Sequence, residues 1–356
     1  MKMELSPRER CLLALSRRKP DKVPKFASFT PAVLERFKRE TGHSDPAEYF
    51  KMEPRHVGFK PLKSLPDFSK YLPSDLPEGT QVDEYGVAHV PGGFYHFTKM
   101  VHPLSGLKTA KELEEYPWPD YTADYRHEHL EEAVRRLQES GYYVCGQVGH
   151  IFETAWYMRG MERLFVDFSD NPEFASKLLD TITEHRAFQA RRMAEAGVDC
   201  IILGDDVGMQ NTMLMSPETW RRWLKPRLAK VIAEAKKIKP EIHVFYHSDG
   251  WIEPIIPDLI EVGVTILNPV QPECMDPAEI KRKYGDRLSF WGTIGTQTTM
   301  PFGTPEEVRR VVKERIETVG YDGGLLLAPT HVLEPDVPWE NIVAFFEAVE
   351  EFGRYR

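Results

Sequence analysis

The feature that most constrains this chain is a regular alternation of short apolar runs with helical patterns through its C-terminal two thirds. The apolar runs predict strands at 142–146, 198–204, 243–247, 265–268, 288–291 and 324–328. Near-continuous apolar strands separated by helices are typical of a parallel sheet with both faces covered. No GxGxxG motif follows the first strand. We therefore predict an α/β fold, a closed TIM (β/α)8 barrel, with a doubly wound sheet as the alternative.

The helices between these strands begin with recognisable signals. Three start with a capping side chain followed by proline, namely Ser216-Pro217, Asp276-Pro277 and Thr304-Pro305. Such caps accept hydrogen bonds from free backbone N–H groups, and proline fits the first helical position. The predicted helices cover 126–140, 161–196 with a break at Asn171-Pro172, 216–224, 226–238, 252–262, a segment opening at 304, and 339–352.

The segment from about 40 to 110 differs from the rest. It is rich in Pro, Asp and Lys and contains the stretch Asp83-Glu84-Tyr85-Gly86. We predict that this segment is an N-terminal insertion, or lid, over the barrel mouth. A chain of 356 residues suits one large barrel, so we expect a single domain over 1–356.

The composition excludes several classes of protein. The net charge of −9 and the lack of a basic run argue against nucleic-acid binding. No apolar run reaches the length of about 18 residues that a membrane span needs. The N-terminal stretch before Pro20 predicts an amphipathic helix and lacks the apolar core of a signal peptide. Four widely spaced cysteines without a CxxC pair indicate reduced thiols in a cytoplasmic protein.

Polar residues at the predicted strand ends are candidate metal ligands. A strand projects His247 and Asp249 to the same side, because side chains alternate with period two. Cys274 and His331 follow two later strands, and in parallel barrels the C-terminal strand ends hold the chemistry. Zinc takes His nitrogen, Cys thiolate and carboxylate oxygen, so these four residues predict a metal site. The alternatives are hydrogen-bonding histidines and a buried loop thiol.

Other strand-end residues are candidates for catalysis and substrate binding. Asp205, Asp206 and Glu153 are the predicted catalytic residues. Asp205 or Asp206 could serve as a metal ligand or as an acid, and the alternative for both is to cap the turn that follows them. An apolar lining with a few polar groups suits a flat or aromatic ligand. Its predicted members are Phe152, Trp156, Tyr157, Met158, Met209, Tyr246 and Gln147. For each apolar member, ordinary core packing is the alternative.

Several motifs together resemble the uroporphyrinogen decarboxylase superfamily. CGQVGHIFETAWYMRG is similar to its glycine-containing strand and following helix, and GDDVGMQNTMLMSPETWRRWLKPRL to its Asp strand and Ser-Pro-Glu helix start. FWGTIGTQ and LLLAPTHVLEPDVPWENIVAFFEAV match the last strands and the closing helix. The resemblance covers almost the whole chain and implies a TIM barrel.

Within the superfamily, the chain is more similar to the corrinoid-dependent methyltransferases than to the decarboxylase proper. The decarboxylase holds its porphyrin carboxylates with an N-terminal Arg-rich motif, whereas the corresponding stretch here, KVPKFASFTPAVLERFKRE, has no Arg between Pro24 and Glu35. The coenzyme M methyltransferases bind zinc through His-x-Cys and a later Cys. Here Asp249 stands in place of the first Cys and His331 in place of the last. The ligands are then mainly nitrogen and oxygen atoms, which are harder (less polarisable) than thiolates, and Cys274 supplements them.

The resemblance implies metal-assisted O-demethylation. A methyl group would pass from a small methylated substrate, a methoxylated aromatic first, to cobalamin on a separate corrinoid protein. Zinc is the expected metal, which polarises the ether oxygen. The alternatives are a decarboxylase of a small carboxylated substrate and a binding protein without turnover. The expected partners are the corrinoid protein and the substrate, with no nucleic acid or membrane and a homodimer left open.

Overall fold

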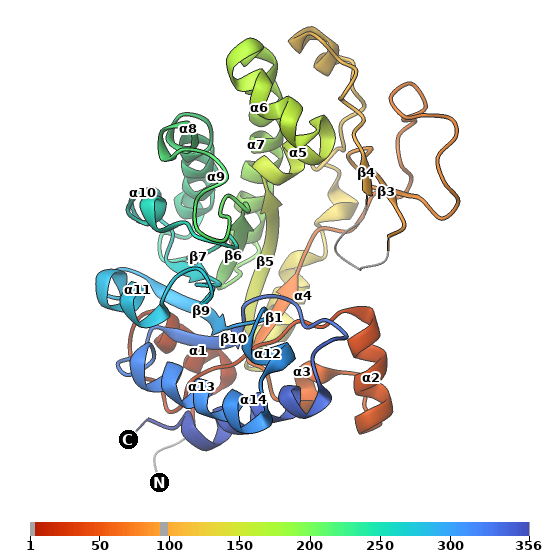
Figure 1. Cartoon of the computed structure of the whole chain (residues 1–356). Coiled ribbons are helices and arrows are strands. Elements are labelled where there is room, and N and C mark those ends of the chain that lie inside the picture. The colour runs from red at the N-terminus through yellow and green to blue at the C-terminus, as the bar shows by residue number, and fades with distance from the viewer. Residues whose placement is uncertain (1–3, 93–98, 356) are drawn as a thin grey trace.

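Seven parallel strands form the central sheet of the computed structural model, which describes residues 4–92 and 99–355. Their spatial order follows the chain without a crossover. They are β1 (Pro54–Val57), β5 (Tyr143–His150), β6 (Cys200–Gly204), β7 (His243–His247), β8 (Ile266–Asn268), β9 (Ser289–Ile294) and β10 (Leu325–Pro329). Each pairs in parallel with its neighbour, and Figure 1 shows the sheet curling into the predicted α/β barrel.

An extended N-terminal segment occupies the eighth position of the barrel. Phe26 N–H donates to the Leu327 carbonyl at 3.0 Å, and Lys25 forms a parallel bridge with Leu327 of β10. On the other side, Lys25 N–H donates to Glu53, just before β1, at 2.9 Å. The barrel is therefore closed by one bridge and by side-chain hydrogen bonds, where the sequence analysis expected a full set of eight strands.

Helices alternate with the strands and cover the outside of the barrel. Ser216, Asp276 and Thr304 are N-caps as predicted, and Thr304 with Glu307 forms a capping box. The helices are α1 (Pro7–Leu15), α2 (Pro31–Thr41), α3 (Pro46–Tyr49), α4 (Leu130–Glu139), α5 (Phe152–Arg159), α6 (Met161–Asp170), α7 (Pro172–Glu195), α8 (Pro217–Trp223), α9 (Lys225–Ile238), α10 (Ile256–Val262), α11 (Pro277–Tyr284), α12 (Thr299–Phe302), α13 (Pro305–Thr318) and α14 (Trp339–Phe352). In the described residues, no helix is long and apolar enough to cross a membrane.

The segment expected to form a lid is only partly an insertion. It contains the barrel strand β1, whose sequence PRHV has no apolar run to mark it. The part after β1 forms a small antiparallel sheet of β2 (Gln81–Val82), β3 (Ala88–Val90) and β4 (Lys99–Val101). Figure 1 shows β3 and β4 outside the barrel, at the upper right, and Lys99 and Met100 of β4 line the cavity at the barrel mouth.

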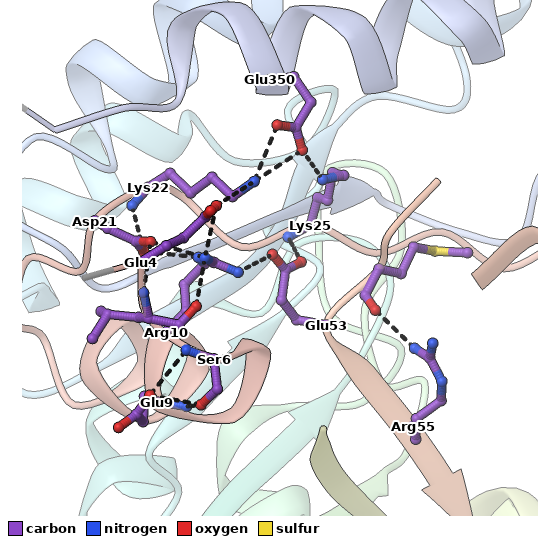
Figure 2. Close-up of polar contacts among 12 residues, drawn as sticks. Glu4, Ser6, Glu9, Arg10, Asp21, Lys22, Lys25, Glu53, Arg55 and Glu350 are labelled. Carbon is purple, nitrogen blue, oxygen red and sulfur yellow. Dashed lines mark hydrogen bonds and ion pairs between the residues drawn. The ribbon is translucent and has the colours of Figure 1, made fainter. Parts of the chain in front are cut away.

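The opposite end of the barrel is closed by α1 and a buried ion-pair network. Cys11 and Leu15 of α1 pack inside the barrel with Tyr143 and Cys145 of β5. Arg10 binds Asp21 at 2.8 Å and Glu53 at 3.1 Å, and its side chain is only 5% exposed. Figure 2 shows these contacts beside the ion pairs of Glu350 with two lysines. This end of the barrel interior is filled, and the two cavities described below lie toward the C-terminal strand ends.

Candidate active site

Asp206, His247 and Asp249 form a group of possible metal ligands at the C-terminal ends of the strands. Asp206 follows β6, His247 ends β7, and Asp249 lies two residues further on. One ligand atom from each lies within 4.8 Å of the other two. His247 Nε2 is 3.4 Å from Asp206 Oδ1 and 3.9 Å from Asp249 Oδ1. Two predicted ligands thus lie together with Asp206, which was predicted as a catalytic residue and possible ligand.

Asn268 determines which nitrogen of His247 faces this group. Asn268 Nδ2 donates to the Trp291 carbonyl at 2.6 Å, so its Oδ1 must accept from another group. That group is His247 Nδ1. With its proton on Nδ1, neutral His247 directs the Nε2 lone pair at the two aspartates, which is the tautomer that metal-bound histidines require.

Two glycines allow the loops that carry the aspartates to touch. A Cβ on Gly208 would lie 2.3 Å from the Asp249 carbonyl oxygen. A Cβ on Gly250, which has φ +80, would lie 2.6 Å from the carbonyl carbon of Gly208. This close approach lets Asp249 N–H donate to Asp206 Oδ1 at 2.9 Å. The backbone therefore fixes the spacing of the two carboxylates.

The electrostatics of the group fit a divalent cation. Burial raises the pKa of Asp249 to about 6, although the charge of His247 opposes the shift. Burial lowers the pKa of His247, but Asp249 and Asp206 outweigh it and leave the pKa above its usual value. Two carboxylates and an imidazole so close together repel or take up protons unless a cation lies among them. One nitrogen and two oxygen ligands suit zinc with one position left open.

A second group, His150, Glu153 and Asp205, lies beside the first. Burial lowers the pKa of His150, but the hydrogen bond and charge of Glu153, 3.3 Å away, raise it to about 9. Asp205 Oδ1 accepts from the N–H groups of Ile151 and Glu153, each at 3.0 Å, where α5 begins. Burial raises the pKa of Asp205 to about 7. Asp205 therefore binds the backbone at the start of α5, whereas the alternative expected from the sequence was a cap on the turn that follows Asp205.

Glu153 connects the two groups. Its Oε1 accepts from Asp206 N–H at 2.7 Å, and its Oε2 accepts from the Tyr157 hydroxyl at 3.3 Å. Burial raises the pKa of Glu153, but His150 lowers it more strongly, to about 2. This carboxylate holds the Asp206 backbone and its charge stabilises protonated His150.

Two other predicted ligands lie outside both groups. His331 Nε2 is 4.0 Å from Asp249 Oδ2, and its ring centroid is 6.4 Å from that of His247. Cys274 follows β8, and its thiol pKa is raised by burial and then by Glu273 and Asp249. The structure therefore brings His331 to the edge of the metal-ligand group and leaves Cys274 out of it.

Two cavities meet at the metal-ligand group. The outer cavity has a volume of about 1490 Å³ and the inner one, within the barrel, about 430 Å³. His150, His247 and His331 line both. Of the predicted substrate-binding residues, the outer cavity contains Trp156, Tyr157 and Met209, and the inner one Gln147.

The other three predicted substrate-binding residues belong to the hydrophobic core. Phe152 and Met158 are 0% exposed and Tyr246 is 1% exposed. For each of them, the alternative of core packing is the better description. Phe152 and Met158 lie on α5, which packs against α6 and α7, and Tyr246 alternates with the inward-facing His247 on β7.

Several cavity residues were not predicted from the sequence. They are Phe26, His56, Asn268, Trp291 and Met100. His56 lies on the unpredicted strand β1, and Phe26 on the extended segment beside it. Asn268 and Trp291 lie within predicted strands, and a period-two assignment of inward positions would have found them.

Three possible metal ligands thus lie at the C-terminal rim of a parallel barrel, with a cavity on each side of them. This arrangement is typical of an enzyme active site. The uroporphyrinogen decarboxylase (URO-D) family model matches residues 98–352, and the chain belongs to this family. The resemblance inferred from the sequence motifs is confirmed.

The relatives of this chain include methyltransferases and decarboxylases. A methylcobamide:CoM methyltransferase of Methanosarcina barkeri is 33% identical over 175 residues, 49% of this chain and 48% of the relative. The match thus spans about half the length of that protein. A uroporphyrinogen decarboxylase of Pseudoalteromonas translucida is 25% identical over 312 residues, 83% of this chain and 82% of the relative. A solved methyltransferase from Methanosarcina mazei shares the fold, with TM-score 0.68, 22% identity and coverage of 98% and 99% of the two chains.

Proposed function

We propose that this protein is a metal-assisted methyltransferase that moves a methyl group from a small methylated substrate to the cobalt of a corrinoid held by a separate protein. The observation that carries the proposal is the group of Asp206, His247 and Asp249 between an inner cavity and an outer one. The inner cavity fits a small substrate, and the outer one is large enough to admit a second reactant. The methyltransferase relative supports the same reaction class.

The residues of the chain prepare the site for this reaction. His247 Nε2, Asp206 and Asp249 would hold zinc, which supplies Lewis acidity at the substrate oxygen when it is bound. Asn268 orients His247, while Glu153 fixes the Asp206 backbone and Asp205 fixes the start of α5. The methyl–oxygen bond breaks, the methyl group passes to cobalt(I), and the oxygen leaves with the electron pair and takes up a proton.

A methoxylated aromatic is the proposed methyl donor. The inner cavity is lined by Phe26, Phe245 and Trp291, and Trp156 and Tyr157 line the outer one. Aromatic walls of this kind bind a flat ring and exclude water from the reacting oxygen.

The second candidate is decarboxylation of a small carboxylated substrate, since decarboxylases are also among the relatives. The cavity lining disfavours a porphyrinogen. Lys99 is the single Lys or Arg among the described residues that line the two cavities. Several carboxylates would need several cations, arginines above all.

Methyl transfer can be followed directly. The full chain, loaded with zinc, is mixed with reduced corrinoid protein and a panel of methoxyarenes, methylamines and methyl thioethers, and methylcobalamin absorbance is recorded. We expect transfer from at least one methoxyarene. Absence of transfer from the whole panel, together with carbon dioxide release from a carboxylated substrate after chelation, would favour the second candidate.

A further inference from the structure

We propose that the inner cavity binds the body of the methyl donor and that His56 and Gln147 select a neutral phenolic hydroxyl on it. The donor would then be a methoxyphenol rather than a methoxybenzoate. This inference rests on the proposed methyl transfer and names its substrate class more closely.

The inner cavity has an aromatic wall that is continuous around part of the barrel. Trp291 of β9 meets Phe26 edge-on, with centroids 5.6 Å apart, and Phe245 of β7 at 5.2 Å. Phe26 in turn contacts the His56 ring of β1 at 5.2 Å. Ile202 of β6 adds an aliphatic surface. A volume of about 430 Å³ with such walls suits one substituted benzene ring.

A polar pair interrupts this apolar lining. Gln147 Nε2 donates to His56 Nδ1 at 2.9 Å, across the neighbouring strands β5 and β1. Both side chains lie on inward strand positions and yet are exposed, because they face the open cavity rather than packed core. One layer below, Cys145 of the same strand is 0% exposed. The pair therefore forms part of the cavity wall.

The pair retains one donor and one acceptor for a ligand. An amide nitrogen only donates, so His56 Nδ1 accepts and the ring proton lies on Nε2. Within the described residues, neither His56 Nε2 nor Gln147 Oε1 makes a hydrogen bond to the protein. Although His56 is open to the cavity, its place inside the barrel removes the ring from bulk water. This desolvation, and then the charge of Arg55, lowers the pKa of His56 to about 4, so the ring is neutral at pH 7. A phenolic O–H donates to Gln147 Oε1, an acceptor that the bond from Gln147 Nε2 to His56 Nδ1 keeps in place.

The same cavity is unsuited to an anionic donor. No lysine or arginine lines it in the described part of the chain. His150, at its upper end, is already paired with Glu153 at 3.3 Å. A carboxylate would also meet the Gln147 oxygen without a proton to share, and an unpaired buried charge is strongly disfavoured. Since His247 lines the same cavity, a ring held by the polar pair lies next to the metal-ligand group.

Equilibrium binding tests the inference without any methyl transfer. Calorimetry on the full, zinc-loaded chain compares 2-methoxyphenol, 1,2-dimethoxybenzene and 2-methoxybenzoate. We expect 2-methoxyphenol to bind about tenfold more tightly than 1,2-dimethoxybenzene, which has no hydroxyl to donate. The carboxylate should bind most weakly of the three.

Variants of the cavity lining show which side chains cause the preference for 2-methoxyphenol. Gln147→Leu removes the acceptor of the hydroxyl, and His56→Phe removes the group that orients this acceptor. Each should reduce the tenfold preference to about twofold or less. Ile202→Val lines the same cavity without a polar atom and should keep the preference. Circular dichroism and the thermal midpoint show whether each variant is folded, and His56→Phe provides the test if Gln147→Leu is not.

The outcomes separate this inference from the proposed function. Binding of 2-methoxyphenol with a preference that depends on Gln147, but without transfer to cobalt, would sustain the cavity assignment and reject the methyltransferase. Transfer from a methylamine or methoxybenzoate, with no preference for the phenol, would sustain the methyltransferase and overturn this inference. A preference that survives in both polar variants would also overturn it.

Discussion

At the scale of single residues, the site depends on the direction of one lone pair. His247 directs Nε2 at Asp206 and Asp249 only because Asn268 Oδ1 accepts a hydrogen bond from His247 Nδ1–H. Asn268 is itself held by the Trp291 carbonyl on the next strand. The ligand group therefore extends one layer of side chains beyond the three residues that would touch a metal.

This dependence can be measured through Asn268. Asn268→Leu removes the acceptor, so His247 can carry its proton on either nitrogen. We expect zinc affinity to fall about 10- to 100-fold, as measured by competition with a chromophoric chelator. Asn268→Asp keeps an acceptor for His247 Nδ1–H, so its zinc affinity should fall far less. Equal losses in the two variants would show that the orientation of His247 does not control affinity.

The composition of the ligand group gives a second prediction. His247→Ala removes the imidazole donor and should abolish stoichiometric zinc in elemental analysis. Cys274→Ala should leave zinc content unchanged, because Cys274 lies outside the group and its raised thiol pKa disfavours the thiolate. Zinc lost in the Cys274 variant and kept in the His247 variant would reverse this assignment.

The sequence predicted His247 and Asp249 as ligands but left Asp206 open between a ligand and an acid, for a physical reason. His247 and Asp249 were identifiable because a strand fixes which residues share a side. Asp206 lies in the loop after β6, where the direction of a side chain depends on backbone contacts such as that between Gly208 and Asp249. Those contacts join segments far apart in the chain, so no local pattern records them.

At the scale of elements, the predicted strands were those with apolar runs. β6, β7 and β10 are buried along most of their length, and their sequences are correspondingly apolar. β1 carries Arg55 and His56 and is recognisable only through its pairing with β5. Missing this strand also meant missing His56, so the error in the fold and the error in the site have one cause.

The buried end of the barrel gives a stability prediction for α1. Arg10→Leu leaves Glu53, whose side chain is 1% exposed, without its guanidinium partner. Breaking a buried pair in this way should reduce the free energy of unfolding by about 3 kcal/mol in urea denaturation at pH 7. The control is Arg135→Ala on α4, where the arginine is 57% exposed and binds Glu132 and Glu139. Its effect should stay within about 0.5 kcal/mol.

The contact between α14 and the N-terminal segment predicts an acid dependence. Burial raises the pKa of Glu350, but Lys25 and then Lys22 lower it from 4.5 to about 2. A depressed folded-state pKa stabilises the fold above pH 4.5, and the contribution disappears as the pH falls to 2. Because Glu350 is 44% exposed, solvent screening limits the contribution to about 1 kcal/mol.

The measurement is a comparison of wild type with Glu350→Gln in urea at a series of pH values. The difference in unfolding free energy should be constant above pH 5 and shrink steadily below pH 4.5. A difference that grows on acidification would contradict the assigned direction of the shift.

At the scale of the whole molecule, the barrel separates two tasks along its axis. Its lower end is filled by α1 and the Arg10 network, whereas its upper end opens through the inner cavity into the outer one. The metal-ligand group lies where the two cavities meet. Substrate binding in the inner cavity and methyl transfer at the ligand group should therefore respond differently to removal of the metal.

Chelation tests this separation. Zinc removed by dialysis against a chelator should abolish methyl transfer, because the substrate oxygen then has no Lewis acid to stabilise the charge it acquires. Binding of 2-methoxyphenol should change less than about threefold, since the aromatic wall and the His56–Gln147 pair do not involve the metal. Zinc added back should restore transfer, which distinguishes loss of the metal from unfolding. If chelation weakened phenol binding as strongly as it weakened transfer, the ring would be held by the metal rather than by the cavity wall, and the two tasks would belong to one site.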